Sequence, residues 1–270
     1  MKKFEGFLLL SDLDGTLLRY DKSISKENRQ AIEYFMSEGG LFSFASGRAP
    51  IAMRALYQEL HPNAPVGCLN GGGIYDFREE RMLWSITIPR TALALAEFVD
   101  KSLPDVGIEV FTTKHIYFCK QNNFTEKHRR DENLPILTCR YYDVDEPITK
   151  ILLAADATRM RALADALIAQ PAAKEFNLMQ SDRNYYEILP HGIDKGNSVR
   201  RLKELLGDRV HTVVSAGDND NDAPMLAASD VGYAVANASE CAKRAANCHT
   251  VSNEEHAIAA IVEELDRTKR

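Results

Sequence analysis

Apolar runs alternate with amphipathic segments over the first 70 residues of the chain. The runs are apolar on both faces, which is typical of strands buried between two layers of helices, and they lie at 7–11, 41–46 and 65–70. The segments between them repeat apolar residues at helical spacing and predict helices at 25–38 and 50–60. This strict alternation predicts an α/β fold with a doubly wound parallel sheet.

The pattern changes between residues 74 and 190. A hairpin is predicted at 74–88, and the elements after it no longer alternate regularly. Helices are predicted at 91–101, 121–133 and 158–169, and strands near 107–119 and at 149–155, 176–180 and 185–189. This order predicts an inserted α+β domain over 84–190.

The alternation returns after the insertion. Helices are predicted at 196–206, 221–228 and 254–265, and strands at 211–216 and 231–236. The sheet domain is therefore discontinuous, and we expect a Rossmann-like core formed by 1–83 and 191–270.

Composition argues against several classes of protein. The net charge of −6 does not suit a protein that binds duplex nucleic acid, which needs a basic surface. The sequence contains no apolar run of about 18 residues and no signal-peptide core, so we expect no membrane partner and a cytoplasmic location. The five cysteines are odd in number and form no CxxC pair, which favours reduced thiols over a zinc site. Both a monomer and a homodimer stay open.

Polar residues and glycines follow each predicted strand of the core. In an open parallel sheet, ligands bind beyond the carboxyl ends of the strands, so these residues are candidates for one site. The segments are Ser11–Thr16, Ser46–Arg48, Asn70–Gly73 and, after the insertion, Gly217–Asp222. Acids, a hydroxyl group and small backbone loops are thus expected at one edge of the sheet.

Four motifs of the chain resemble those of the haloacid dehalogenase (HAD) superfamily. They are "DLDGT" at 12–16, "SGR" at 46–48, "DKG" at 194–196 and "GDNDNDAPML" at 217–226. The large insertion, and the asparagine-glycine turn at residues 70 and 71, are similar to the Cof-type branch of that superfamily, which carries a type IIB cap domain. The resemblance covers nearly the whole chain.

The resemblance implies roles for the acids. Asp12 would be the nucleophile that attacks phosphorus, and Asp14 would donate a proton to the leaving alcohol and later take one from water. Mg²⁺, which prefers oxygen ligands, would be held by Asp12, by the backbone carbonyl of Asp14 and by Asp218. Asp222 would orient Lys195 or a metal-bound water, and it is a further candidate metal ligand.

The resemblance also implies residues that hold the substrate. Candidates for the phosphate group are Leu13, Ser46, Gly47, Lys195 and Asn221. Candidates for the leaving group lie at strand tips or near the return from the insertion, and they are Arg48, Asn70, Gly71, Arg183, Tyr186 and His191. Ordinary structural interpretations stay open for some side chains: Ser46 as a helix N-cap and Lys195 as an exposed helix residue. His115, His128 and His191 are expected to be exposed to solvent or to make a structural hydrogen bond.

The expected function is therefore a magnesium-dependent phosphomonoesterase. It would act on a small phosphorylated metabolite, such as a sugar phosphate, through an aspartyl-phosphate intermediate, and the cap would close over the site. A phosphomutase or a synthase-related phosphoryl transferase could use the same acids, whereas a non-catalytic binding protein would have lost one of them. "DNDND" at 218–222 is no calcium loop, because Ala223 and Ser229 stand where that loop needs glycine and glutamate.

Overall fold

The computed structural model describes residues 2–268 and divides the chain into two compact units. The first unit contains the chain up to Arg48, Arg54–Leu83 and the chain from Asp194 onward. The second, which we call the inserted unit, contains Ala49–Met53 and Trp84–Ile193.

A five-stranded parallel sheet forms the centre of the first unit. Its strand order is β13-β12-β11-β1-β2, which places β1 and β11 side by side in the middle. The strands are β1 (Phe7–Ser11), β2 (Leu41–Phe44), β11 (Thr212–Gly217), β12 (Val231–Ala234) and β13 (Cys248–His249). Every residue of β2 is buried, as are the last four of β1, which confirms the interpretation of these apolar runs.

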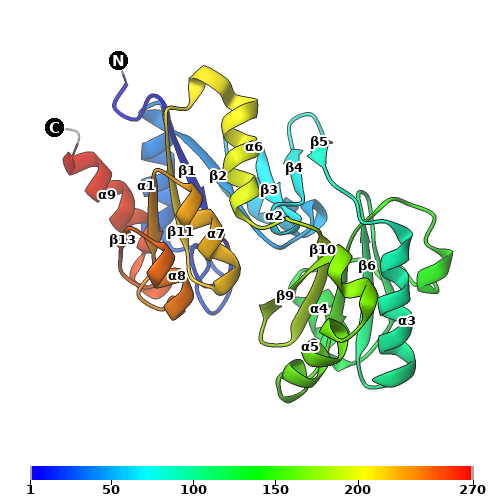
Figure 1. Ribbon diagram of the computed structural model, residues 1–270. Helices are drawn as coiled ribbons and strands as arrows, with labels where there is room; N and C mark the ends of the chain where they lie inside the picture. The colour runs from blue at the N-terminus through cyan, green and yellow to red at the C-terminus, as the bar shows by residue number, and fades with distance from the viewer. Residues whose placement is uncertain (1, 269–270) are drawn as a thin grey trace. The chain divides into compact units, whose positions relative to one another are not determined.

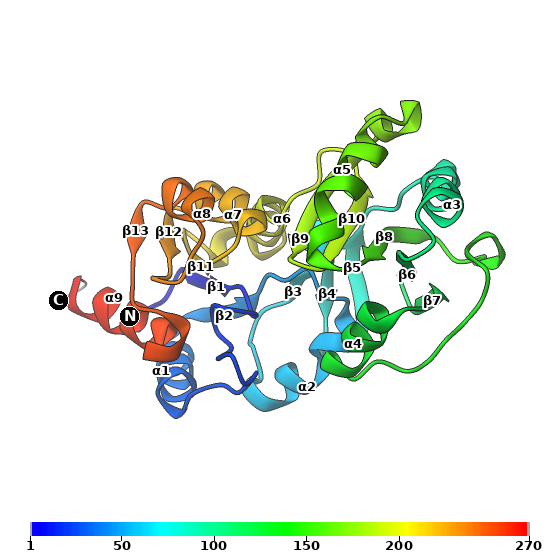
Figure 2. The same cartoon turned by 90° about the horizontal axis from the view of Figure 1, so that it is seen from below.

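Helices cover both faces of this sheet. Figures 1 and 2 show α1 and α9 on one face and α6, α7 and α8 on the other. These helices are α1 (Lys26–Ser37), α6 (Gly196–Leu206), α7 (Ala223–Ala228), α8 (Glu240–Ala245) and α9 (Ala257–Thr268). The helix α2 (Pro50–Leu60) is divided between the two units at Met53. The Ser25 hydroxyl caps α1 by accepting a hydrogen bond from the Asn28 N–H. The doubly wound α/β core is therefore confirmed.

The third predicted strand does not extend the parallel sheet. β3 (Val66–Cys68) pairs antiparallel with β4 (Gly73–Asp76), and β5 (Arg81–Ser85) completes a separate three-stranded sheet. A single bridge between Ala45 and Gly67 links β3 to the end of β2. The ladder stops there because Leu69 and Asn70 both have positive φ and turn the chain back.

The inserted unit is built on a second five-stranded sheet, of order β7-β6-β8-β10-β9 with antiparallel pairing between its neighbours. The strands are β6 (Gly107–Thr112), β7 (Ile116–Lys120), β8 (Ile148–Ala154), β9 (Phe176–Asp182) and β10 (Tyr185–Pro190), and the helices are α3 (Leu93–Ser102), α4 (Asn123–Asp131) and α5 (Met160–Ile168). Apolar residues of α3 and α5 pack with alternate residues of β6, β8 and β10 into one core.

His128 of α4 has a structural role in this unit. Its Nδ1 lies 2.7 Å from Oε2 of the buried Glu109 in β6, and its Nε2 lies 3.2 Å from Glu132. Burial alone would lower the pKa of His128, but the two carboxylates raise it to about 10. The imidazole is therefore charged, and its contact with Glu109 holds α4 against the face of the sheet that lies opposite the apolar core.

Within residues 2–268, no helix is long and apolar enough to span a membrane.

Candidate active site

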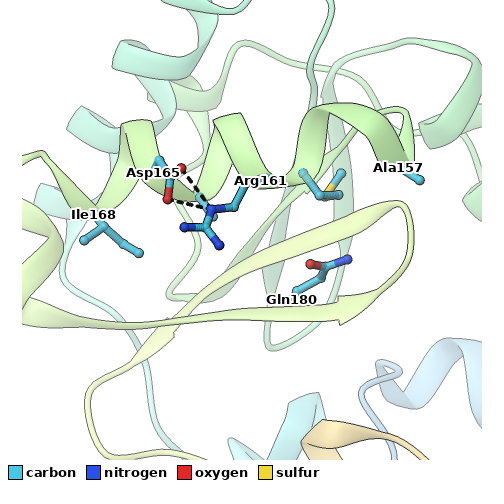
Figure 3. A pocket seen from close by; sticks show the side chains of 7 residues that line it. Ala157, Arg161, Asp165, Ile168 and Gln180 are labelled. Carbon is cyan, nitrogen blue, oxygen red and sulfur yellow. Dashed lines mark hydrogen bonds and ion pairs between the residues drawn. The ribbon is translucent and has the colours of Figure 1, made fainter. Parts of the chain in front are cut away.

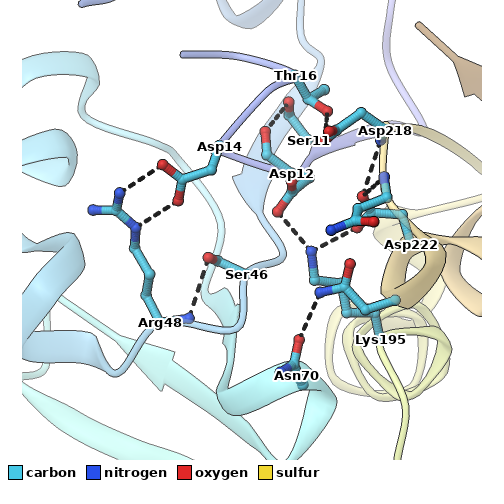
Figure 4. A network of polar contacts seen from close by, with 12 residues as sticks. Ser11, Asp12, Asp14, Thr16, Ser46, Arg48, Asn70, Lys195, Asp218 and Asp222 are labelled. Atoms are coloured by element: carbon cyan, nitrogen blue, oxygen red, sulfur yellow. Dashed lines mark hydrogen bonds and ion pairs between the residues drawn. The ribbon is translucent and has the colours of Figure 1, made fainter. Parts of the chain in front are cut away.

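Two strand ends bring the acids of the first unit together. Ser11 of β1 pairs with Ala216 of β11, so Asp12 and Asp218, which follow these strands, lie at the same edge of the sheet. Figure 4 shows Asp12 and Asp218 beside Asp222, with Lys195 approaching from the segment before α6. A glycine at position 15 lets the loop after β1 lie close to Asp218, because a Cβ there would lie 2.4 Å from Oδ2 of Asp218.

Asp12, Asp218 and Asp222 form a compact carboxylate cluster. One oxygen from each lies within 4.8 Å of the others. Asp12 and Asp222 are buried, Asp218 is partly exposed, and the Thr16 hydroxyl donates a hydrogen bond of 2.9 Å to Asp218 Oδ1. Among the described residues this is the one group of three or more acids, histidines or cysteines that meets the spacing of a metal site.

Lys195 is the cation of this cluster. Its Nζ lies 2.6 Å from Oδ1 of Asp12 and 2.6 Å from Oδ1 of Asp222, and its side chain is 2% exposed. Burial alone would lower the pKa of Lys195, but the two carboxylates raise it above its usual value, so the ammonium stays charged. The interpretation of Lys195 as an exposed helix residue is therefore wrong.

Asp222 holds the site in shape. Its Oδ1 accepts from Lys195, while its Oδ2 accepts hydrogen bonds of 2.9 Å from the backbone N–H groups of Asp218 and Asn219. Both oxygens are thus engaged by the protein, which agrees with a role in orienting Lys195 and the loop after β11.

The cluster carries more negative than positive charge once its acids are ionised. Three carboxylates then surround one ammonium group, and burial together with the charge of Asp222 raises the pKa of Asp12 to about 7 and that of Asp218 to about 8. A divalent cation with oxygen preference would neutralise this excess, so the residues present fit Mg²⁺.

Asp14 lies apart from the cluster and faces two other cations. Arg48 binds it with two hydrogen bonds, Nε to Oδ2 at 2.9 Å and Nη2 to Oδ1 at 2.8 Å, and Lys22 Nζ lies 2.7 Å from Oδ1. Burial would raise the pKa of Asp14, but the charges of Arg48 and Lys22 lower it to about 2. In this structure, Asp14 is therefore a carboxylate held by Arg48 and Lys22.

Three of the candidates for phosphate binding, Ser46, Gly47 and Asn221, lie against Asn70. Nδ2 of Asn221 donates a hydrogen bond of 3.1 Å to Asn70 Oδ1, and a Cβ on Gly47 would lie 3.0 Å from the Asn70 amide. The buried Ser46 hydroxyl accepts a hydrogen bond from the Arg48 N–H at 3.2 Å. Gly71, with φ of +87°, follows Asn70 and approaches the backbone of Asp194, and Leu13 is fully buried.

Three leaving-group candidates belong to the inserted unit. Tyr186 packs in the apolar core of that unit and is 6% exposed, so the expectation that it contacts a substrate is not supported. It occupies a core position because side chains alternate along β10 and its neighbours Tyr185 and Glu187 face the other way. Arg183 and His191 are exposed, and their substrate contacts stay a prediction.

Two contacts of the site were not predicted from the sequence. Thr16 supports Asp218, and its place in "DLDGT" next to Gly15 was the available signal. Lys22 pairs with Asp14, but an isolated lysine eight residues along the chain gives no such signal.

A hollow of the inserted unit lies beside α5 and β9 and has a different character. Figure 3 shows Ile168, Ala157 and Gln180 around it, with Arg161 paired to Asp165 on the same helix face. Its lining contains one acid, Asp165, which is paired with Arg161, so it has no carboxylate cluster like that of the first unit.

Comparisons with known proteins agree with this geometry. The model of a family described as haloacid dehalogenase-like hydrolases matches residues 9–262. The 5-amino-6-(5-phospho-D-ribitylamino)uracil phosphatase YwtE of Bacillus subtilis is 25% identical, over 94% of this chain and 96% of that protein. A solved haloacid dehalogenase-like hydrolase from Bacteroides thetaiotaomicron is 26% identical, with a TM-score of 0.82 over 97% of this chain and 99% of that one. The HAD subclass IIB sugar phosphatase BT4131 has a TM-score of 0.81 at 19% identity, over 95% and 98% of the two chains, which shows the fold alone.

Proposed function

The chain belongs to the haloacid dehalogenase-like hydrolases, and on that premise we propose that it is a magnesium-dependent phosphomonoesterase with Asp12 as its nucleophile. The observation that carries this proposal is the buried contact of Asp12 with Lys195 beside Asp218 and Asp222. It combines a carboxylate nucleophile, a fixed cation and an excess of negative charge at the edge of a parallel sheet where ligands bind.

Asp12 attacks the phosphorus atom with one carboxylate oxygen and displaces the alcohol, which leaves an aspartyl phosphate. Lys195 neutralises charge on the transferring group, and Ser46, Asn221 and the backbone N–H groups of Leu13 and Gly47 donate hydrogen bonds to its oxygens. Mg²⁺, held by Asp12, Asp218 and the Asp14 carbonyl with Asp222 as a further candidate ligand, would supply additional neutralisation of the phosphate charge. Water then attacks phosphorus, releases phosphate and restores Asp12.

Asp14 serves as the acid of the first step and the base of the second. A carboxylate held by Arg48 and Lys22 carries no proton to give, so these contacts have to be exchanged when a substrate enters. Arg48 would then exchange its contact with Asp14 for the oxygens of the substrate, which is consistent with its place among the leaving-group candidates.

We expect the Asp14→Asn variant to lose activity according to the leaving group. For an alkyl phosphate, whose leaving alkoxide is strongly basic, the first turnover should slow by about 10² to 10⁴. For p-nitrophenyl phosphate, whose leaving group needs no proton, the first release of nitrophenolate should slow much less. Rapid mixing with both substrates measures this difference, and equal losses would remove Asp14 from the acid role.

The carboxylate cluster should make stability depend on pH and on metal. Without metal, folded Asp12 and Asp218 keep their protons up to about pH 7 and 8, whereas the unfolded groups lose them near 3.8. The folded state then binds more protons than the unfolded state, so the cluster's contribution to stability falls as pH rises from about 4 to 8. Mg²⁺ should offset this loss and raise the melting temperature by roughly 5 °C at high pH and by less at low pH.

Thermal unfolding at about pH 5.5 and pH 8, with Mg²⁺ or with EDTA, checks this prediction. The Asp218→Asn variant is the control: it should be more stable than the parent without metal at the higher pH and should gain less from Mg²⁺. The same Mg²⁺ shift at both pH values, or in both proteins, would contradict the assignment of the cluster.

The substrate we propose is a small phosphorylated metabolite rich in hydroxyl groups, and the inserted unit would act as the cap that selects it. Two observations support this class: YwtE is named for a phosphorylated ribitylamino compound, and BT4131 is a sugar phosphatase of the same fold. A screen of phosphorylated metabolites for Mg²⁺-dependent phosphate release, with Asp12→Asn as the blank, tests the proposal. Transfer of the phosphoryl group to a sugar without phosphate release would favour a phosphomutase or a synthase-related transferase instead.

A further inference from the structure

The inserted unit contains a pair of cysteines that the proposed reaction does not use. Cys119 lies in β7, which is an edge strand of the sheet, and Cys139 lies in the irregular segment 134–140 that follows α4. The Phe118 N–H donates a hydrogen bond of 2.8 Å to the Leu137 carbonyl, so this segment runs beside β7. Both cysteine side chains pack against the same apolar core.

The two thiols line the same surface hollow and are close enough for each to shift the pKa of the other. The Sγ of Cys119 also donates to the Tyr117 carbonyl at 3.6 Å. Both residues are partly exposed, and a surface hollow opens beside them, lined by Phe118, Cys119, Gln121, Thr138, Cys139 and Arg140. A small reagent can therefore reach the pair from solvent.

We propose that Cys119 and Cys139 are a modification site that forms a reversible disulfide and fastens the segment 134–140 to β7. A disulfide needs two cysteines on neighbouring backbone segments with their side chains close together. The hydrogen bond between Phe118 and Leu137 joins the two segments, and both cysteine side chains line one hollow and pack against one core. The proposal is independent of the phosphatase reaction, because both residues lie in the inserted unit and neither belongs to the carboxylate cluster.

The oxidant would be a low-molecular-weight disulfide. The thiolate of Cys139 attacks one sulfur of that reagent, the reagent's S–S bond breaks, and one small thiol leaves while a mixed disulfide forms on Cys139. Burial raises the pKa of the Cys119 thiol, so Cys119 loses its proton only as it attacks the Cys139 sulfur and releases the second small thiol. The two thiol protons of the protein end on the two small thiols, and two electrons pass from the cysteine pair to the reagent.

The disulfide should protect the segment that it closes. Arg140, next to Cys139, has a side chain that is 84% exposed and offers trypsin a cleavage site at the end of an irregular stretch, directly before the short 3₁₀ helix Tyr141–Asp143. Anchoring the neighbouring residue to β7 suppresses the local opening that cleavage requires, so we expect the oxidised protein to be cut after Arg140 at least about fivefold more slowly.

The test treats the full chain with oxidised glutathione under native conditions and maps the peptides without reductant. We expect a peptide that links Cys119 to Cys139, a loss of about 2 Da from the intact protein, and full reversal by dithiothreitol. In the Cys119→Ser variant, Cys139 should instead keep glutathione as a mixed disulfide. The Cys248→Ser variant, with a half-buried cysteine of the first unit removed, should form the same link as the parent.

Other outcomes would overturn the proposal. Free thiols or separate glutathione adducts at Cys119 and Cys139, without a linked peptide in the parent protein, would show that the fold does not bring the two sulfurs together for exchange. A link that forms equally fast in urea would show that chain flexibility, and not the native contact, produces it.

Discussion

Asp12→Asn should lose at least about four orders of magnitude in phosphomonoester hydrolysis. The neutral amide that replaces the carboxylate cannot attack phosphorus. Among the described residues, Asp222 is the other carboxylate in contact with Lys195, and it cannot take over because its Oδ2 accepts a hydrogen bond from the backbone of the loop after β11. Initial rates of phosphate release from p-nitrophenyl phosphate and from a sugar phosphate, both with Mg²⁺, measure the loss.

The substitution should leave the fold intact. Burial and the charge of Asp222 already disfavour the ionised form of Asp12, so removing its charge should keep or raise the melting temperature without metal. Asp220→Asn is the matched control, because Asp220 is an exposed acid of the same loop that accepts from Ser239 at 2.6 Å, and this variant should keep its activity. A rate within about tenfold of the parent for Asp12→Asn would contradict the nucleophile assignment.

Lys195→Met should have the largest effect on stability and also remove most activity. The variant leaves two buried carboxylates without their shared cation, and breaking a buried pair in this way costs about 3 to 5 kcal/mol. The rate should fall by at least about 10², because a fixed positive charge is lost where the phosphate oxygens gather. Urea unfolding without metal and kcat with Mg²⁺ give the two quantities.

Lys203→Met, on the helix α6 that follows Lys195, provides the comparison. Lys203 pairs with Asp230 at the surface, where the two side chains are 45% and 43% exposed, so its loss should cost less than about 1 kcal/mol. Adding Asp222→Asn to Lys195→Met should recover part of the stability, because one unpaired carboxylate disappears, without recovering activity. Similar losses of stability for Lys195→Met and Lys203→Met would contradict the prediction that the buried network around Lys195 stabilises the fold more than a surface ion pair does.

The backbone of the first unit follows closely from local sequence. The apolar run before Asp12 could only be a strand buried on both faces, and Ser25 and Gly39 mark the two ends of α1 by ordinary capping chemistry. The rule that ligands bind beyond the strand ends then predicts from the sequence alone that Asp12 and Asp218 lie together.

The partners of the side chains are harder to predict from the sequence, because they depend on contacts between residues far apart in the chain. Nothing local distinguishes Asp14, held by Arg48 and Lys22, from Asp12, which lies beside Lys195. Tyr186 and the short β3 are two places where the structure differs from what the sequence predicts. Alternation along β10 turned an expected ligand into a core residue, and a turn of positive φ at Leu69 and Asn70 removed β3 from the parallel ladder.

The central claim is that Asp12 carries the phosphoryl group, and trapping that intermediate tests it most directly. In Asp14→Asn, nitrophenyl phosphate should still phosphorylate Asp12, while the following attack by water lacks its base, so the phosphoenzyme should accumulate. Acid quenching with a radiolabelled substrate should then give about one label per chain, removable by hydroxylamine and located on the peptide that contains Asp12. Label on another peptide, or steady nitrophenol release from this variant with no labelled protein, would contradict the account.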